Sequence, residues 1–597
     1  MVVQKTIRRH GVTLAHGPFV ARETALVCAA DCRKDGAPIT CRATALTACL
    51  PPKGVVGYDV IVFVGLQRFV AHRQREEIRL ALSTEYGIAL SDGEISHLYR
   101  RFLAYLEALH EARADKLRAA LAADGGWPLH IDATGEDGRG TLLVAFAGWR
   151  HWVLGAWKIP TERAETILPK LLGVVDKFGA PCAIMRDLGR AMKDAADGIV
   201  AALGRPIPVL ACHMHFLRDV GKDLLVDAHD RLRDLFRRFD VKKGLRTLAR
   251  DLGRALGKDI AQARKGLLDW QRTDEGHVLP DGQAGLATVR ALAQWVLDFH
   301  VDGEDQGFPF DQPYLDLHDR CQTACRAADA FLRLPLTDPK VQKNLRRLRR
   351  ILDPIDAEIP FRKVAATLHA RAALFAELRD ALRLRTKPSG KSPKAPTVLS
   401  HEQAAADLRD IQTAVDDLTA SLVQRRPERG PAQDQRQAID IVLAHLSRHG
   451  RFLWGHAIQL PPNAGGGIRL VDRTNNGEET LFHHFKRGER RRSGRKILSQ
   501  DMEQLPPAAV LALNLKNADY VSILCGSLDN LPQAFAELDA GNRRRSSLVL
   551  RAKARVADGT DCDIASASLP AEDRTLIRTD DMDRRIQAAA RSRPPRS

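Results

Sequence analysis

The spacing of apolar and polar positions predicts an α/β segment between Trp127 and Arg218. Short apolar runs of strand length alternate there with patterns of helical period. Thr161 is a candidate N-cap for the first of these helices, and Pro169 predicts a kink or a break within it. The expected strands are 129–133, 141–147, 152–159, 181–186 and 207–211.

The pattern changes after this segment. From about Asp219 to Gly450 strand patterns nearly vanish, and Leu and Ala recur at helical spacing, which predicts a long all-helical block. A Pro/Ser/Lys-rich stretch at 387–394 predicts a flexible linker inside this block.

A helical pair is expected ahead of the α/β segment. Ser91 and Glu94 form an S-x-x-E capping box, which marks the start of a helix after a short turn. Helix, turn and capped helix fit a helix-turn-helix, with His97, Arg100 and Arg101 in the second helix, and fit an ordinary helical hairpin equally well.

Composition narrows the class of protein. The 597 residues carry a formal net charge of +17, and 44% of them are hydrophobic, which predicts a globular chain of three to five domains. We see no secretory signal and no apolar run of the ~20 residues that span a bilayer, so no membrane partner is expected. Ten cysteines make no disulfide scaffold, which favours a reducing cytoplasm. The positive charge indicates either nucleic-acid binding or solubility alone.

Two aspartates in the α/β segment are candidates for chemistry. Asp132 lies within an apolar strand, and Asp187 follows a later one. If these strands are neighbours, the two carboxylates face each other and repel unless a cation lies between them. Hard ions such as Mg²⁺ or Mn²⁺ prefer these oxygen ligands. The alternative is that each aspartate makes only local hydrogen bonds.

These residues, in their order along the chain, resemble a known family. The run His130 to Thr134, then Asp187 after a strand, then Thr474-Asn475-Asn476-Gly477-Glu478-Glu479 is similar to a bacterial DDE transposase. The resemblance implies a ribonuclease H-like core interrupted by an all-helical insertion. It also implies that Asp132, Asp187 and Glu479 hold two Mg²⁺ (or Mn²⁺) ions. Glu478 remains an alternative third ligand, and Asn476 with Glu479 could instead form a helix cap.

The same resemblance sets the expected domains. The fold class is multidomain α/β plus α, and the expected regions follow the chain. They are a Cys-bearing N-terminal segment (1–57), a helix-turn-helix-like DNA-binding region (58–126), the first part of the core (127–218), the all-helical insertion (219–464), the last core helix with the third acid and a basic run (465–500), and a C-terminal region with a disordered basic tail (501–597).

Three further groups of side chains are candidates for binding or support. Cys212 and His215 match a C-x-x-H motif of related transposases, and we expect them to support the core. A basic run after Glu479 would bind phosphates next to the metal site; its cations are Lys486, Arg487, Arg490, Arg491, Arg492, Arg495 and Lys496. Weakly spaced cysteines are either a zinc site or four buried thiols; they are Cys28, Cys32, Cys41 and Cys49.

The expected function is that of an insertion-sequence transposase. It would bind the terminal inverted repeats of its element and catalyse strand cleavage and strand transfer into target DNA, acting as a homodimer or larger assembly on DNA in the bacterial cytoplasm. The alternatives are a non-catalytic DNA-binding protein derived from a transposase, and a metal-dependent DNA nuclease.

Overall fold

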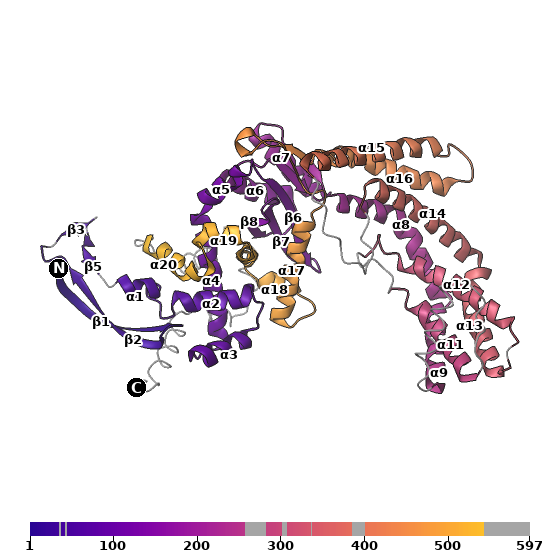
Figure 1. Cartoon of the computed structure of the whole chain (residues 1–597), viewed down its shortest axis with the longest axis horizontal. Helices are drawn as coiled ribbons and strands as arrows, with labels where there is room; N and C mark the ends of the chain where they lie inside the picture. The colour runs from indigo at the N-terminus through magenta and orange to yellow at the C-terminus, as the bar shows by residue number, and fades with distance from the viewer. Residues whose placement is uncertain are drawn as a thin grey trace. The chain divides into compact units, whose positions relative to one another are not determined.

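The chain forms two compact units, which a computed structural model describes for residues 1–30, 32–34, 37–41, 44–256, 282–300, 307–335, 337–384 and 400–541. The sheet unit comprises Met1–Cys212 and Gly455–Ser597, and the helical unit comprises His213–Trp454 (Figure 1). Within the sheet unit, the N-terminal helices, the sheet and the C-terminal helices share one hydrophobic core. The predicted linker at 387–394 and the predicted basic tail lie outside the described residues.

A mixed five-stranded sheet organises the sheet unit. All five predicted strands are present, with the order β10-β9-β6-β7-β8 across the sheet. β6, β9 and β10 run parallel, while β7 is antiparallel to both β6 and β8. The strands are β6 (Pro128–Glu136), β7 (Arg139–Ala147), β8 (Trp152–Lys158), β9 (Ala183–Arg186) and β10 (Val209–Ala211).

Two helices connect the last three strands. α6 (Ala164–Phe178) begins after Arg163, so the predicted N-cap at Thr161 is wrong. Of the predicted kink or break at Pro169, the break is wrong, since α6 continues through the proline, and the kink stays a prediction. One missing N–H costs the helix a hydrogen bond, and the buried apolar face of α6 compensates for that loss. α7 (Arg190–Leu203) follows β9 and packs against α6.

The N-terminal segment is a β-ribbon followed by a short helix. β1 (Val2–Thr13) and β2 (Gly17–Val27) form a long antiparallel hairpin, to which β5 (Thr40–Cys41) adds a short third strand. The two-residue strands β3 (Arg33–Lys34) and β4 (Ala37–Pro38) precede β5, and α1 (Thr44–Cys49) follows it.

The predicted capped helix is confirmed. α2 (Tyr58–Phe69) and α3 (Arg75–Tyr86) precede α4 (Asp92–Ala112), whose Ser91 and Glu94 make both hydrogen bonds of the capping box. α3 ends at Gly87, whose φ of 64° favours glycine. Much of α4 is buried, including Arg101. This helix therefore packs in the hydrophobic core of the sheet unit. DNA binding by this region remains a prediction.

C-terminal helices complete the core of the sheet unit. The hydroxyls of Tyr58 and Tyr105 each donate a 2.7 Å hydrogen bond to Asp539 Oδ2, which ties α2 and α4 to the end of the described chain. The C-terminal helices are α17 (Asn476–Ser493), α18 (Ser499–Gln504), α19 (Ala518–Cys525) and α20 (Leu531–Gly541); α5 (Ala114–Ala123) leads from α4 to β6.

We expect the sheet unit to lose stability in acid through His110. This side chain is 2% exposed and contacts the Tyr520 hydroxyl and the Leu154 carbonyl, and burial lowers its pKa to about 4. An unfolded histidine has a pKa of about 6.5, so the stabilisation is complete above that pH and about 3 kcal/mol is lost as the pH falls to 4. Urea unfolding across this pH range measures the loss. In His110→Gln the slope of stability against pH should be smaller, and an equal slope would refute this role.

The regular elements of the helical unit are all helices among its described residues, as the pattern from Asp219 to Gly450 predicts. The predicted end of the insertion at 464 is wrong, because β11 (Ala457–Gln459) belongs to the sheet unit and pairs with β12 (Ile468–Leu470). Cys321 and Cys325, which lie four residues apart on one helix, are both buried. No described helix of the chain is both long and apolar enough to cross a membrane. The helices of this unit are α8 (His213–Arg238), α9 (Val241–Ala255), α11 (Gly282–Leu297), α12 (Pro313–Leu332), α13 (Pro339–Ala357), α14 (Ile359–Ala381), α15 (His401–Arg425) and α16 (Gln433–His449).

Candidate active site

The two predicted aspartates lie level with each other on neighbouring strands. β6 and β9 are parallel, and their paired residues run from Pro128 with Ala183 to Ile131 with Arg186. Asp132 follows Ile131, and Asp187 follows Arg186. The register of the two strands therefore places the two aspartates side by side. The condition set by the sequence, that the two strands be neighbours, is therefore met.

Asp132 has the electrostatics of a buried acid among other acids. Asp132 is 8% exposed. Its burial is the larger cause, and the negative charge of Asp187 the second, that raises its pKa to about 7. The Ala133 N–H donates a 2.8 Å hydrogen bond to Asp132 Oδ1, which opposes this shift only in part. Glu479 and Glu162 also raise the pKa of Asp132. A cation would relieve this repulsion.

Helix α17 brings the late acidic residues to β6 (Figure 1). Its N-cap residue, Asn475, is fully buried; the Asn475 Oδ1 lies 2.7 Å from His130 Nδ1, and its N–H donates to Cys212 Sγ at 3.2 Å. Further along α17, Lys486 Nζ donates a 2.7 Å hydrogen bond to the carbonyl of Gly135. These contacts hold the first turns of α17 against the strand that carries Asp132.

The two glutamates of α17 differ in environment. Glu478 is fully buried, and neither of its carboxylate oxygens has a partner with hydrogen-bond geometry. Burial, then Asp132 and Asp187, raise the pKa of Glu478 well above its ordinary value, although the Asn475 side chain and a backbone N–H lie near enough to oppose the shift. Glu479 is half-buried and interacts with Asp132. The alternative of a cap formed by Asn476 and Glu479 is wrong, because the N-cap is Asn475.

Sequence reasoning missed two neighbours of the aspartates. Glu162 precedes α6, and burial followed by the charge of Asp187 raises its pKa. His130 orients Asn475 from the strand of Asp132. The alternation of β6 could have indicated His130, since it lies two residues before Asp132 on the same face. No sequence signal marks Glu162, which lies in a loop between β8 and α6.

The donor set suits hard divalent ions. All the acids are oxygen ligands, and the acidic neighbours that raise the pKa of Asp132 indicate that the site favours added positive charge. The ligand oxygens of Asp132, Asp187 and Glu479 do not all lie within 4.8 Å of one another, since among the described residues another group alone meets that limit. Ligands of two ions spaced 3.5–4 Å apart can be separated by more than this.

The residues of the C-x-x-H motif fall on either side of the point along the chain where the sheet unit gives way to the helical unit. Cys212 is the last residue of the sheet unit, fully buried after β10, and its sulfur accepts the hydrogen bond from Asn475. His215 lies in the first turn of α8 in the helical unit. Cys212 thus contacts the helix that carries the glutamates.

Most cations of the basic run already have partners. Arg490 pairs with Glu136 at 3.0 Å, Arg491 with Glu77 at 2.7 Å, and Arg495 with Asp501 at 3.4 Å. Arg492 is buried, pairs with Glu489 and lies over the ring of Phe69, so its charge is not on the surface. Two exposed cations of the run, Arg487 and Lys496, pair with no acidic group in the described parts of the chain.

The N-terminal cysteines do not gather as a four-thiol site. Cys28 and Cys32 are hydrogen-bonded neighbours, and the bond from Cys32 lowers the pKa of Cys28. Cys41 lies on β5 and Cys49 at the end of α1, and both are exposed, so the alternative of four buried thiols is wrong. All four cysteines are described, and no three of their sulfurs lie within 4.8 Å of one another.

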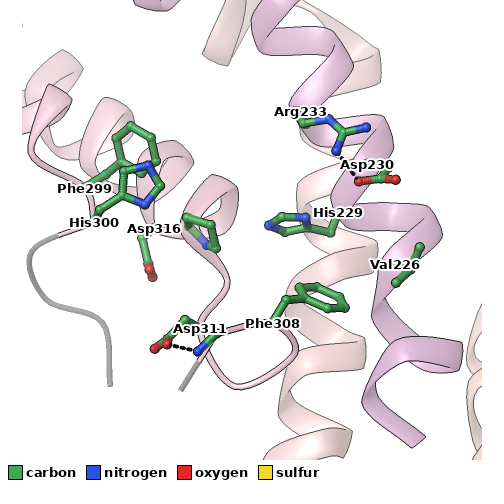
Figure 2. Close-up of a pocket in the computed structure, with 11 residues that line it drawn as sticks. Val226, His229, Asp230, Arg233, Phe299, His300, Phe308, Asp311 and Asp316 are labelled. Atoms are coloured by element: carbon green, nitrogen blue, oxygen red, sulfur yellow. Dashed lines mark hydrogen bonds and ion pairs between the residues drawn. The ribbon is translucent and has the colours of Figure 1, made fainter. Parts of the chain in front are cut away.

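A separate pocket of about 560 Å³ lies in the helical unit between α8 and the segment leading into α12. Figure 2 shows His229 and Phe308 on facing elements, with Arg233 paired to Asp230 on α8. This pocket contains none of the residues predicted from the sequence. Its lining residues are Val226, His229, Asp230, Arg233, Phe299, His300, Gly307, Phe308, Asp311, Pro313 and Asp316.

No family model matches the chain, and no curated protein matches it.

Proposed function

We propose that the chain is a DDE-type transposase whose sheet unit has a ribonuclease H-like core. The observation that carries this proposal is the level placement of Asp132 and Asp187 on neighbouring parallel strands, with an acidic helix turn held against the first of them. The sheet order, with a central β6 between a parallel and an antiparallel neighbour, supports the same core. The helical unit, inserted between β10 and α17, supports a core with an all-helical insertion.

The side chains have distinct roles in this proposal. Asp132, Asp187 and Glu479 hold two Mg²⁺ or Mn²⁺ ions, which when bound would activate the attacking oxygen and stabilise the leaving one. Glu478 remains a neutral carboxylic acid, as its full burial favours. Asn475, His130 and Cys212 position α17 through their mutual hydrogen bonds.

One assay separates this function from its alternatives. The protein is incubated with Mg²⁺ and labelled duplexes taken from the DNA that flanks its own gene, with a target plasmid present. Cleavage with joined product supports a transposase. Cleavage without joining supports a metal-dependent nuclease, and binding without cleavage supports a non-catalytic DNA-binding protein derived from a transposase. Inverted repeats in that flanking DNA would identify the ends to use.

We expect Arg487 and Lys496 to contribute to DNA binding beside the site. Lys486 and Arg490 fix this part of the chain to the end of β6, so the two unpaired cations lie near the strand of Asp132. Each phosphate contact contributes about 0.9 to the slope of log K against log salt, so Arg487→Ala with Lys496→Ala should lower the slope by about 2. Fluorescence anisotropy over a salt series measures it.

A matched pair of substitutions controls for net charge. Lys116→Ala with Arg118→Ala removes two exposed cations from α5, which leads into β6 at the end of the strand away from Glu136. This control should leave the salt slope nearly unchanged. Equal slopes for both double variants would remove the basic run from the DNA-binding surface.

A further inference from the structure

Two helices of the helical unit bring together a His–Asp–His group. His318 and Asp319 lie on α12 and His369 on α14. Asp319 Oδ1 lies 3.2 Å from His318 Nδ1 and 2.9 Å from His369 Nε2. All three ligand atoms lie within 4.8 Å of one another, and no other group of the described residues meets this limit.

These distances suit a tetrahedral ion with nitrogen and oxygen ligands. Zinc binds imidazole nitrogen and carboxylate oxygen at about 2.0–2.2 Å, so neighbouring ligand atoms of a tetrahedron are separated by about 3.4 Å. The two separations from Asp319 Oδ1 are within about half an ångström of that value. Imidazole ligands favour Zn²⁺ over Mg²⁺, which prefers oxygen. The group therefore differs in kind from the carboxylates of the sheet unit.

The three side chains of the His–Asp–His group differ in their exposure to solvent. The His318 side chain is 3% exposed, whereas the side chains of Asp319 and His369 are each 47% exposed. The residues one turn before and after His369 on α14 are all alanines, at 365, 366, 372 and 373. No long side chain of α14 therefore crowds the imidazole, and water can reach the group to supply a fourth ligand.

Two hydrogen bonds from histidines determine the environment of the Asp319 carboxylate. Burial alone would raise the pKa of Asp319, but hydrogen bonds from His318 and His369 lower it below its ordinary value. The Asp319 carboxylate thus faces both imidazoles, as three ligands of one ion must.

We propose that His318, Asp319 and His369 bind one Zn²⁺ ion, with water as the fourth ligand, and that this ion links α12 to α14. The site is independent of the carboxylates of the sheet unit and does not depend on the proposed transposase activity.

Counting bound zinc tests this proposal on the full chain. The protein is stripped with a chelator, loaded with Zn²⁺, freed of excess by gel filtration and measured by elemental analysis. A Cys28→Ser, Cys32→Ser background removes zinc held by those thiols. In this background His369→Ala and Asp319→Asn should each lose one zinc equivalent per chain, while His401→Ala, at an exposed position at the start of α15, should lose none.

A melting measurement distinguishes lost binding from lost folding. Zn²⁺ should raise the melting temperature of the parent and of His401→Ala, but not that of Asp319→Asn, which keeps the shape of the side chain. The proposal is overturned if the parent retains no zinc, or if His369→Ala and Asp319→Asn retain as much as the parent.

Discussion

Asp132→Asn is expected to lower Mg²⁺-dependent strand cleavage by about 10³-fold. Bound metal contributes several kcal/mol to the stabilisation of transition-state charge, and each 1.36 kcal/mol is a factor of ten in rate. Asn keeps the size of the side chain but removes the negative charge that the ions need. Single-turnover cleavage of an end-labelled duplex measures the rate.

A second buried aspartate provides the control for this substitution. Asp539 is 8% exposed, the same as Asp132, and accepts hydrogen bonds from Tyr58 and Tyr105 away from the strand carboxylates. Asp539→Asn should keep cleavage within a few fold of wild type. Without metal, Asp132→Asn should be at least as stable as wild type, because it removes repulsion with Asp187. Full cleavage by Asp132→Asn would show that this residue holds no essential ion.

The two adjacent glutamates of α17 should respond very differently to the same change. Glu479→Gln is expected to lower cleavage by about 10³-fold, as for Asp132, because it removes a metal ligand. Glu478→Gln should stay within about tenfold of wild type, since Gln has the shape and neutrality of the protonated acid that burial favours. Each variant is the other's control, because both change a Glu to a Gln in the same helix turn.

Mn²⁺ binding gives a second readout for this pair. Electron paramagnetic resonance should show weaker Mn²⁺ binding in Glu479→Gln and nearly normal binding in Glu478→Gln. If the effects are reversed, Glu478 is the third ligand and our assignment is wrong. Equal activity of both variants would remove α17 from the metal site.

The strands and the two aspartates could be predicted because their signals are local. Apolar runs of strand length identified β6 and β9, and the position of Asp187 immediately after β9 follows from the sequence alone. That β6 and β9 are neighbours could not be derived from periodicity, since it depends on how the whole sheet is ordered. The sequence left it as a condition for the two carboxylates to face each other.

Other features depend on contacts between distant residues. The charges of the basic run predicted a cationic surface, but Arg492 is buried against Phe69 and Glu489, and three other arginines pair with acids. Composition does not reveal such pairings. Likewise, neither glutamate of α17 has a sequence feature that predicts its burial, because burial is set by the contacts of Asn475 with His130 and Cys212. His369 could not be paired with Asp319 from the sequence, since they lie on different helices.

Counting the Mn²⁺ ions that Asp132 and Asp187 hold tests the central claim most directly, because it measures the metal site itself and not the outcome of a reaction. Equilibrium binding is measured on wild type, Asp187→Asn and the Asp539→Asn control, each with a short duplex of flanking DNA. We predict that wild type and Asp539→Asn each bind two additional Mn²⁺ ions per chain, compared with Asp187→Asn. Equal numbers of bound ions in all three proteins would contradict a two-ion site formed by these carboxylates.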